Sequence, residues 1–578
     1  MKREIQKFFK GEVEDSEEVL KKYSHDASVF EVRPKLVLYP KDGEDVRRLV
    51  EWVRDNKDRY NDQKLNEGWA MLSITARCAG TDMSGGAIGE SLILDFTRHM
   101  NKLVKGPEPV KNSGVFTRQN PTGSDATQNF AVPASITVQP GMFYRDFEKI
   151  TKEYGLILPC YTASKDLNAM GGMYGNNSAG EKTLKYGKTE DYIVEAKVVF
   201  ADGVERTVKP FPVSEILTQE EVYKKLFNLI KKDEKEIMRA KPKVHKNSAG
   251  YYIWNVLHDG VFDLNKLLVG SQGTLGIATE ITFRLVPVQP HSKLVTIFMS
   301  DLEPLGRLVD EILKQNPETV EAYDDKTMKL AVRFFPDFLK NKGFIGMVKF
   351  MWSFMPEFRM ALRGGIPKLI LLVEFAGVNE GQVNAQCLKL EEAIRNFKLK
   401  VHITKSEAEA GKYWDVRRQS FNLLRKHVKE KRTAPFIDDI IVRPEFLPKF
   451  IPELNNILGQ YDLTYTIAGH AGDGNFHIIP LMDFSHPDTG KIILELSDKV
   501  YDLVLRYHGS ITAEHNDGII RTPYLSKMFA PHILDIFKET KKIFDPKNIL
   551  NPGKKVGGSK QYISSHLALE HPKSHHSS

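Results

Sequence analysis

Two short segments in the last quarter of the chain carry the residue types that bind metal ions and move protons. The first, GHAGDGNFH, contains His470 and His477, and the second, AEHNDG, contains Glu514 and His515. Two imidazoles and a carboxylate suit a borderline divalent cation such as Zn²⁺, Mn²⁺ or Fe²⁺. Extended chain would separate the two histidines by about 24 Å, so the glycines between them must fold that segment before both rings can reach one ion.

Glu514 and His515 are neighbours in the sequence, which limits how they can share a site. Adjacent side chains on a strand point to opposite faces, so a strand could not aim both at one ligand. A turn would place the carboxylate on the metal and the imidazole beside a substrate. For each histidine taken singly, a turn or a buried polar position stays the alternative interpretation.

Two glycine-rich segments are suited to hold an anion on backbone amides. One, RCAGTDMSGG, covers residues 77–86, and the other, GGMYGNNSAG, covers residues 171–180. Glycine permits positive φ and close backbone approach, so successive N–H groups can form a nest for a pyrophosphate, and Thr81 and Ser84 add hydroxyl donors. Neither segment has the spacing GxGxxG or the P-loop pattern. A dinucleotide would therefore need another fold, and tight turns remain the alternative.

Hydrophobic periodicity predicts the elements that position these loops. Apolar residues at the i, i+3, i+4, i+7 spacing predict a helix with Val46, Leu49, Val50 and Val53 on one face. The lysine-rich residues 220–243 are interpreted as a solvated, helical insertion. Strands are predicted by β-type runs over residues 35–40, 72–76, 91–96, 134–139, 193–200 and 277–285.

Composition excludes several classes of protein. The 578 residues are 41% hydrophobic and 27% charged, which is an ordinary globular mixture with room for three or four domains. Only three cysteines are present, too few and too far apart for a cysteine-ligated cluster or a disulfide scaffold. A net charge of +7 does not argue for nucleic acid. With no secretory signal and no 18-residue apolar run, we expect a cytoplasmic protein, soluble or peripheral to the membrane.

The order of motifs along the chain resembles the FAD-linked D-2-hydroxy-acid dehydrogenases, which include D-lactate dehydrogenase, the flavin subunit of glycolate oxidase and D-2-hydroxyglutarate dehydrogenase. Their FAD-binding domain is of the vanillyl-alcohol-oxidase or PCMH type. The match runs from about residue 20 to 556. It is carried by DAS at residues 26–28, the loops at 77–86 and 171–180, KNSAGY at 246–251 and VGSQGTLGI at 269–277.

This resemblance implies an α+β fold in which an FAD-binding domain of two α/β subdomains precedes a substrate domain with an antiparallel sheet. The expected organisation is an N-terminal extension (1–32), a PCMH-type FAD-binding domain (33–289), a substrate domain (290–510), a segment that returns to the flavin domain (511–556) and a disordered tail (557–578).

The resemblance also implies that FAD binds without a covalent link. Cys78 stands where many relatives carry glycine and Gln272 where many carry glutamate, but neither change removes the backbone amides. The expected cofactor contacts are Arg77, Gly80, Thr81, Asp82, Ser84, Gly85, Pro140, Gly141, Pro159, Ser164, Gly171, Gly172, Asn176, Ser178, Gly180, Gly273, Gly276, Ile277 and Asn551.

By the same resemblance, His470, His477 and Glu514 are metal ligands and His515 is the general base. A substrate carboxylate is best held by an arginine fork, and the segment YWDVRR offers Arg417, with Arg418 as the alternative. Asn475 joins the expected substrate contacts. Relatives that act on D-2-hydroxyglutarate offer a lysine downstream, where this chain has Asp438 and Asp439, which argues against a dicarboxylate substrate.

The implied reaction oxidises a D-2-hydroxy acid of the D-lactate or glycolate type to the 2-keto acid. Electrons would pass from FAD to a separate acceptor, either a quinone, a cytochrome or an electron-transfer flavoprotein. Two alternatives are a flavin transferase similar to alkyl-glycerone-phosphate synthase and a non-catalytic flavin subunit of an electron-transfer complex. The basic, aromatic residues 333–368 are interpreted either as a peripheral membrane contact or as a helical hairpin on the substrate domain, and no nucleic-acid partner is expected.

Overall fold

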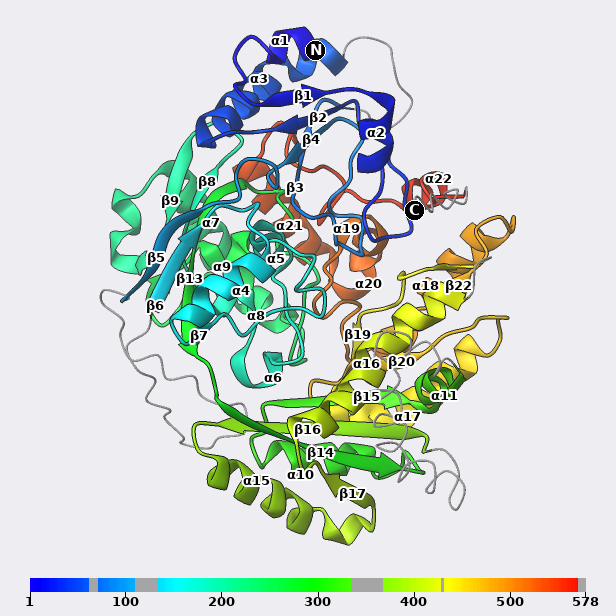
Figure 1. The fold of residues 1–578 in the computed structure, drawn as a ribbon. Coiled ribbons are helices and arrows are strands. Elements are labelled where there is room, and N and C mark those ends of the chain that lie inside the picture. The colour runs from blue at the N-terminus through cyan, green and yellow to red at the C-terminus, as the bar shows by residue number, and fades with distance from the viewer. Residues whose placement is uncertain (62–70, 110–133, 334–366, 428–430, 570–578) are drawn as a thin grey trace.

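The computed structural model describes residues 1–61, 71–109, 134–333, 367–427 and 431–569. Two parts are visible in Figure 1. The upper part holds the N-terminal half of the chain together with the C-terminal segment, and the lower part holds a sheet of its own with its helices. The fold is α+β, as predicted, because separate sheets are each covered by helices.

The first sheet positions the loop at residues 77–86. Its strand order is β1-β2-β4-β3, and its last three strands are parallel. Parallel neighbours need a crossover, and α3 (Gly43–Asn61) supplies it with its four predicted apolar residues fully buried. The predicted strands here are confirmed. The four strands are β1 (Glu12–Glu14), β2 (Leu36–Tyr39), β3 (Ile74–Arg77) and β4 (Leu92–Asp95).

A second sheet in the upper part has the order β5-β6-β13-β8-β9 and is antiparallel throughout. The three strands predicted in this region are confirmed as β6, β8 and β13. Along this path the strands are β5 (Leu103–Pro109), β6 (Ala134–Val138), β8 (Ile193–Val199), β9 (Glu205–Val208) and β13 (Ile277–Pro287). A sixth strand, β7 (Leu156–Ile157), pairs with β13 off this path. The helices beside it are α4 (Tyr144–Glu153), α5 (Met170–Asn176) and α9 (Asn265–Leu268), whereas α6 (Thr183–Tyr186) contacts β15 of the lower sheet.

The interpretation of residues 220–243 as a solvated insertion is wrong. This segment forms α7 (Glu221–Lys232) and α8 (Glu234–Ala240), and α7 packs against α21 (Pro531–Phe544). Leu226 is fully buried in the main core, and Ile230 is nearly so. The lysines occupy only the outward face of an amphipathic helix, so their number in the sequence concealed its apolar face.

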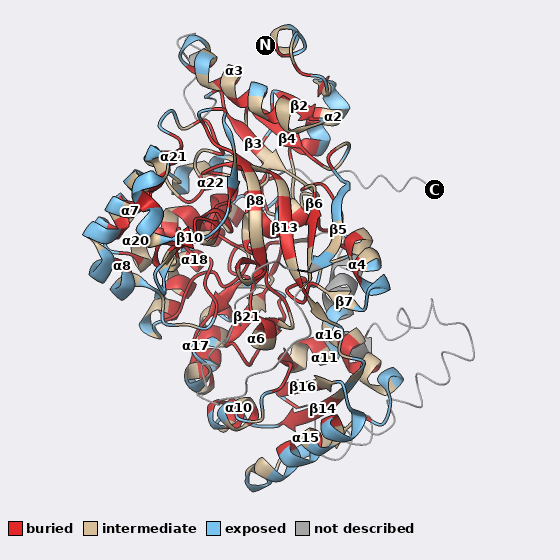
Figure 2. Ribbon diagram, turned by 90° about the vertical axis from the view of Figure 1, so that its left-hand side faces the viewer, coloured by how far each residue is buried: buried red, intermediate tan, exposed pale blue. Residues whose placement is uncertain are grey.

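The lower part contains an antiparallel seven-stranded sheet of order β17-β14-β16-β15-β20-β21-β19. Helices α10 (Leu305–Leu313), α15 (Glu380–Ala393) and α17 (Leu447–Leu458) pack on one face, while α11 (Asp325–Arg333) and α16 (Glu407–His427) lie on the other. Figure 2 shows the strands as buried layers between these helices. The strands are β14 (His291–Met299), β15 (Thr319–Asp324), β16 (Leu369–Gly377), β17 (Lys400–Ile403), β19 (Ile440–Ile441), β20 (Ile467–His470) and β21 (Asn475–Ile478).

The C-terminal segment lies against the first sheet of the upper part, where the Ile74 N–H donates to the Ile549 carbonyl at 2.7 Å. The structure differs from the expected disorder over residues 557–569. Helix α22 (Lys560–Ser565) is capped by Ser559, and Ile563 is fully buried. Apolar residues among the polar ones anchor this stretch to the core.

Two sequence interpretations concern residues that lie in part outside the described chain. These are residues 570–578 of the tail and residues 334–366 of the basic, aromatic stretch. A membrane contact by that stretch therefore remains a prediction. Within the described part of the chain, every helix is too short or too polar to cross a bilayer.

Burial of α7 makes a prediction about stability. Leu226→Ala should lower the free energy of unfolding by about 2–5 kcal/mol, because it leaves a cavity in the core. Denaturant unfolding followed by circular dichroism would measure this change. The matched control is Lys225→Ala, one residue away on the exposed face, which should leave the unfolding midpoint unchanged. Equal midpoints for the two variants would contradict the placement of this helix.

Candidate active site

Three predicted metal ligands converge where the lower sheet meets the C-terminal segment. Strands β20 and β21 form a hairpin that closes through residues 471–474, with Gly474 at a φ of 76°. The Glu514 Oε1 atom lies 3.3 Å from His470 Nε2 and 3.3 Å from His477 Nε2. All three ligand atoms fall within 4.8 Å of one another. This donor set has the composition that a divalent transition metal requires.

Each of these three side chains has a second partner that fixes which atom it presents. His470 Nδ1 bonds to Glu321, and the His477 Nδ1–H donates to the Asp438 carbonyl at 2.9 Å. The two Nε2 nitrogens therefore face one Glu514 oxygen, and His470 Nε2 forms a hydrogen bond to that oxygen. Outer partners of this kind set the orientation and tautomer of metal-binding histidines.

Sequence reasoning missed Glu321, which lies on β15 about 150 positions before His470. The pairing of Ala322 with Gly469 across β15 and β20 brings the two residues next to each other. Glu321 is almost fully buried, and burial alone would raise its pKa, but His470 and Arg417 hold the pKa below its usual value. It is therefore an ionised acceptor. An isolated glutamate in a strand gives no local signal of this role.

His515 lies beside the metal-ligand triad with its ring stacked on His477, at 5.0 Å between centroids and 21° between planes. His515 Nδ1 is 2.8 Å from an oxygen of Asp438, which also pairs with the fully buried Arg521. The carboxylate therefore orients the ring so that Nε2 faces away from it. This is the base-and-orienter arrangement found in proton-transfer sites.

Opposing effects set the proton affinity of His515. Burial lowers its pKa, but the carboxylates of Asp438, Asp439 and Glu514 outweigh burial and raise the pKa to about 10. A general base must be neutral, so these carboxylates alone would keep the imidazole protonated at neutral pH. A dication held by Glu514 would act in the opposite direction and favour the neutral ring.

Asp439 fixes the turn that carries Glu514 and His515. One carboxylate oxygen accepts the N–H groups of Ala513, Glu514 and His515 at 2.9, 2.9 and 2.7 Å, and also the Thr512 hydroxyl at 2.6 Å. The turn predicted from the adjacency of Glu514 and His515 is therefore present, and it directs the two side chains differently.

The prediction against a dicarboxylate substrate assumed that Asp438 and Asp439 face the substrate, and this assumption is wrong. Asp438 and Asp439 are both fully buried and bonded beneath the site, so neither faces a substrate. Asn475 also needs correction as a substrate contact. Its amide is fully buried and donates to Asp439 and to the Ile440 carbonyl, each at 3.1 Å.

The two candidate arginines occupy different places. Arg417 donates its Nε–H to the second oxygen of Glu321 at 3.0 Å, and its Nη2 atom lies 2.9 Å from the same oxygen, which ties Arg417 to the triad. Arg418 pairs with Glu181 at 2.5 Å and lies over the Trp414 ring, with half of its side chain exposed. Arg417 is therefore the arginine held at the candidate metal site.

The predicted cofactor loops meet each other through polar side chains. Asp82 accepts the Gly86 N–H at 2.6 Å and the Asn176 amide at 2.8 Å, so it organises the loops rather than offering a donor to a phosphate. Asn551 donates to the carbonyls of Gly86 and Gln272 at 2.9 and 2.7 Å. The loops at 77–86, 171–180 and 270–276 thus form one surface.

Other predicted cofactor residues divide into two groups. Gly80, Gly85 and Gly273 adopt positive φ, as a cradle of backbone amides requires. Gly276 and Ile277 instead face the core at the start of β13, where a Cβ on Gly276 would lie 2.5 Å from Val198. These two predicted contacts are therefore wrong.

Further predicted contacts border the loops. Arg77 folds over Gly80 and lies 5.1 Å from the Tyr23 ring. Gly171 donates its N–H to the Pro140 carbonyl at 2.7 Å. Those for which the structure offers no decisive contact, and which stay predictions, are Thr81, Ser84, Gly141, Pro159, Ser164, Gly172, Ser178 and Gly180.

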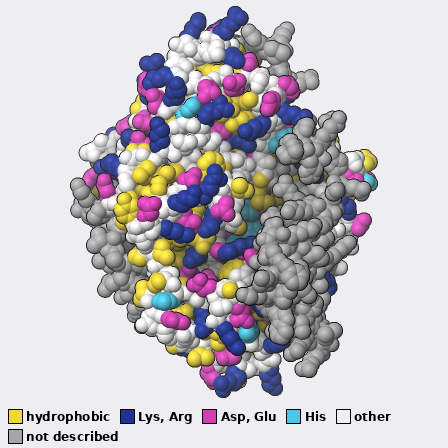
Figure 3. Space-filling view, in the orientation of Figure 1, with side chains coloured by type: hydrophobic (Ala, Val, Ile, Leu, Met, Phe, Trp, Pro, Cys, Tyr) yellow, Lys and Arg dark blue, Asp and Glu magenta, His cyan; other side chains and the backbone are white. Residues whose placement is uncertain are grey.

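One further observation supports the binding of a dinucleotide to this surface. Asn177 has a φ of 52° and is buried, and its amide Nδ2 has no hydrogen-bond partner among the described residues. A buried donor without a partner costs free energy unless a ligand accepts from it. Figure 3 shows histidine and basic side chains near the middle of this face, where the two parts of the molecule meet.

Comparison with known protein families matches both parts of the chain. The FAD binding domain model matches residues 128–209, and the model of the C-terminal domain of FAD linked oxidases matches residues 288–555. The D-2-hydroxyglutarate dehydrogenase of Escherichia coli is 25% identical over 548 residues, covering 92% of this chain and 49% of that protein. The chain therefore has both domains of the FAD linked oxidases, and the proteins similar to it carry the names of the FAD-linked D-2-hydroxy-acid dehydrogenase family.

Relatives of this dehydrogenase family differ in length. The chain spans about half of the D-2-hydroxyglutarate dehydrogenases it matches. Two others match along their length. Glycolate oxidase subunit GlcD of Bacillus subtilis is 26% identical, covering 92% of this chain and 91% of its own. The D-lactate dehydrogenase of Anaerostipes hadrus is 24% identical, covering 93% of each chain.

Solved structures confirm the fold. An alkyldihydroxyacetonephosphate synthase superposes with a TM-score of 0.63 at 15% identity, covering 96% of this chain and 85% of that one. A p-cresol methylhydroxylase superposes with a TM-score of 0.62 at 14% identity, covering 94% of each chain. At this identity the likeness shows the PCMH-type fold alone.

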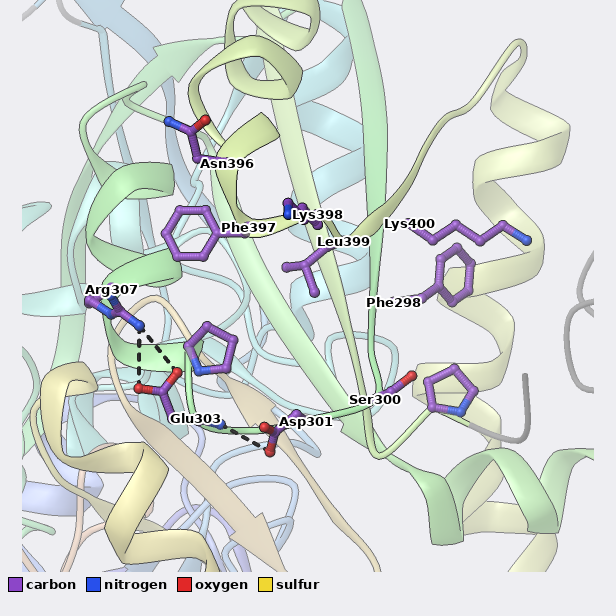
Figure 4. Close-up of a pocket in the computed structure, with 12 residues that line it drawn as sticks. Phe298, Ser300, Asp301, Glu303, Arg307, Asn396, Phe397, Lys398, Leu399 and Lys400 are labelled. Carbon is purple, nitrogen blue, oxygen red and sulfur yellow. Dashed lines mark hydrogen bonds and ion pairs between the residues drawn. The ribbon is translucent and has the colours of Figure 1, made fainter.

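A pocket of about 740 Å³ lies elsewhere in the structure, at the edge of the lower sheet (Figure 4). It is formed by the end of β14, the start of α10 and the segment before β17. Phe298, Arg307, Phe397 and Lys400 are among the residues that line it. Its lining includes none of the predicted catalytic, metal-binding or cofactor residues, so we place the chemistry at the histidine cluster instead.

The anchoring of the turn makes a prediction. Asp439→Asn replaces one acceptor oxygen with an amide, so N–H donors of the 512–515 turn lose their partner, which should cost about 2–4 kcal/mol of stability. Thermal unfolding would measure this loss. The affinity of the protein for zinc should fall about 10- to 100-fold. Inductively coupled plasma mass spectrometry of protein equilibrated with zinc would measure how much stays bound. The exposed Asp462→Asn variant is the control, and identical zinc binding in both variants would contradict the anchoring role.

Proposed function

We propose that this protein oxidises a D-2-hydroxy acid, of the D-lactate or glycolate type, to the corresponding 2-keto acid. The observation that carries the proposal is the convergence of His470, His477 and Glu514 with the His515–Asp438 pair stacked beside them. A divalent cation held by the first three residues would lower the pKa of the substrate hydroxyl.

Arg417 is proposed to bind the substrate carboxylate. A guanidinium has five N–H donors, and Glu321 accepts the one on Nε. The remaining donors can hold a carboxylate next to the candidate metal site. Because Glu321 also bonds His470, the substrate anchor and one metal ligand are positioned by the same carboxylate.

His515 is proposed to remove the hydroxyl proton through Nε2. Its Nδ1 is fixed by Asp438, which stabilises the imidazolium formed when the proton arrives. FAD, when bound, takes up the hydride that leaves the 2-carbon of the substrate. The substrate thereby loses one proton and one hydride, and the two electrons must leave the protein to a separate acceptor.

The acceptor and the substrate's chain length belong to the same proposal. We propose a quinone, a cytochrome or an electron-transfer flavoprotein as acceptor, and a peripheral membrane contact is one route to a quinone. Since Asp438 and Asp439 lie beneath the site, a longer dicarboxylate is tested alongside the smaller acids. A transferase of the alkyldihydroxyacetonephosphate synthase kind is favoured only by a shared fold.

His515 provides the first functional test. With FAD bound and Zn²⁺ or Mn²⁺ supplied, D-lactate, glycolate or D-2-hydroxyglutarate should bleach the flavin absorbance in anaerobic stopped flow, while L-acids should not. His515→Gln should slow the bleaching about 10²- to 10⁴-fold, because general-base assistance is lost, and chelation should also suppress it. Absence of bleaching by every acid, with flavin and metal present, would overturn the proposal and favour a non-redox flavin protein.

The two arginines provide a matched pair. Arg417→Lys should raise the KM for the hydroxy acid by about tenfold or more, because a single ammonium cannot repeat the planar fork. Arg418→Lys should have the smaller effect, since Arg418 pairs with Glu181 away from the triad. Steady-state kinetics with an artificial acceptor would measure both. Exchange of the two effects would make Arg418 the substrate anchor.

A further inference from the structure

We propose that Lys246 is a positioning residue that holds Glu514 as a one-oxygen metal ligand, so that the cation keeps coordination positions open for the substrate. This inference rests on the proposed function. The Lys246 Nζ atom lies 3.1 Å from Glu514 Oε2 and 3.0 Å from Asp473 Oδ2. The other oxygen of Glu514, Oε1, is the one that faces both histidines.

Burial makes this contact unusual. The Lys246 side chain is fully enclosed, and its two carboxylate partners, Asp473 and Glu514, are 2% and 6% exposed. Lysine is almost never fully buried unless it is paired. Glu514 therefore has one oxygen already engaged by a buried ammonium.

Charge alone does not explain a lysine in this position. A positive ammonium about 3 Å from a ligand carboxylate repels a dication, so it weakens the site electrostatically. Lys246 instead fixes the orientation of the Glu514 carboxylate. While Oε2 is bonded to Nζ, Glu514 cannot bind an ion through both oxygens, and three protein ligands leave a cation with open positions, as catalytic sites require.

Lys246 also joins the two segments that carry the ligands. Asp473 belongs to the hairpin between His470 and His477, whereas Glu514 belongs to the separate turn at 512–515. A single ammonium bonded to both carboxylates therefore fixes the hairpin relative to the turn. His245, the preceding residue, bonds to Asp473 as well.

The backbone around Lys246 is attached to the same turn. The Ser248 N–H donates to the Thr512 carbonyl at 3.0 Å, and its hydroxyl donates to the Ala513 carbonyl at 2.9 Å. The Ser510 hydroxyl donates to Asn247 at 2.7 Å. Lysine and carboxylate are thus held by one bonded unit, which keeps their distance fixed when the metal site is loaded.

The test compares two variants that differ in one donor. Both carry Asp473→Asn, so that loss of the lysine charge leaves fewer buried carboxylates unpaired. Lys246→Met in that background removes the donor to Glu514, and Lys246→Gln retains an N–H₂ group that can reach it. Each protein is loaded with Co²⁺, whose visible absorption weakens as its coordination number rises, and is then titrated with D-lactate.

We expect the Met variant to bind Co²⁺ with weaker visible absorption than the Asp473→Asn parent, and to lose the spectral response to D-lactate. Its KM for D-lactate should rise about 10- to 100-fold, the range typical of outer-sphere changes. The Gln variant should recover part of both properties. Identical spectra, spectral responses and KM values in parent, Met and Gln proteins would overturn the inference.

Controls separate this inference from the proposed function. Lys188→Met removes another buried lysine from the same region, one that donates to the Asn247 carbonyl at 3.1 Å but contacts none of the three ligands; it should leave the Co²⁺ spectrum unchanged. Wild-type protein that binds no Co²⁺ would overturn the metal-dependent function itself. Wild-type protein that binds and responds, together with unchanged variants, would overturn the role of Lys246 alone. If the Met protein does not fold, Lys246→Leu replaces it as the variant without a donor, and properties equal to those of the Asp473→Asn parent again overturn the inference.

Discussion

The candidate site depends on the bonds that a single buried carboxylate makes to the backbone. Asp439 accepts three successive N–H groups and one hydroxyl on the same oxygen, and its other oxygen takes the Asn475 amide from the metal-site hairpin. Bonds from N–H groups to an ionised acceptor are about twice as strong as neutral ones. They hold the turn in the shape that sends Glu514 toward the histidines and His515 alongside them.

The same turn continues toward the cofactor loops. Beyond His515 the chain enters α19 (Gly518–Arg521), where Gly518 donates its N–H to the Gln272 side chain at 2.8 Å and Ile519 donates to the Ser84 carbonyl at 2.8 Å. The candidate base and the expected flavin surface are therefore separated by only a few residues of firmly bonded chain. The fold places two sites from different parts of the molecule on one short segment.

Much of this arrangement could be predicted from the sequence. The loops at 77–86 and 171–180 were predictable from their glycine content, the strands from their β-type runs, and the histidine cluster from its residue types. Local patterns of this kind predict the secondary structure or the ligand type of a segment. They do not predict which distant segment it contacts, and so Glu321, on a strand without any motif, could not be found.

Other errors have equally physical causes. Asp438 and Asp439 look like pocket residues in the sequence because carboxylates are normally exposed, yet here buried donors compensate their burial. The lysines of α7 concealed an apolar face, and Gly276 resembles its cradle-forming neighbours although it packs against the sheet. In each case the tertiary contacts, rather than the local pattern, decide the role of the residue.

Anomalous diffraction tests the central claim most directly. Crystals of the FAD-loaded protein, grown with Zn²⁺ and measured on both sides of the zinc absorption edge, should show one strong anomalous peak bonded to His470 Nε2, His477 Nε2 and Glu514 Oε1. That result would establish the convergence of the hairpin and the turn on one ion. An absent peak at full flavin occupancy, or zinc bound instead between Asp438, His477 and His515, would contradict the account.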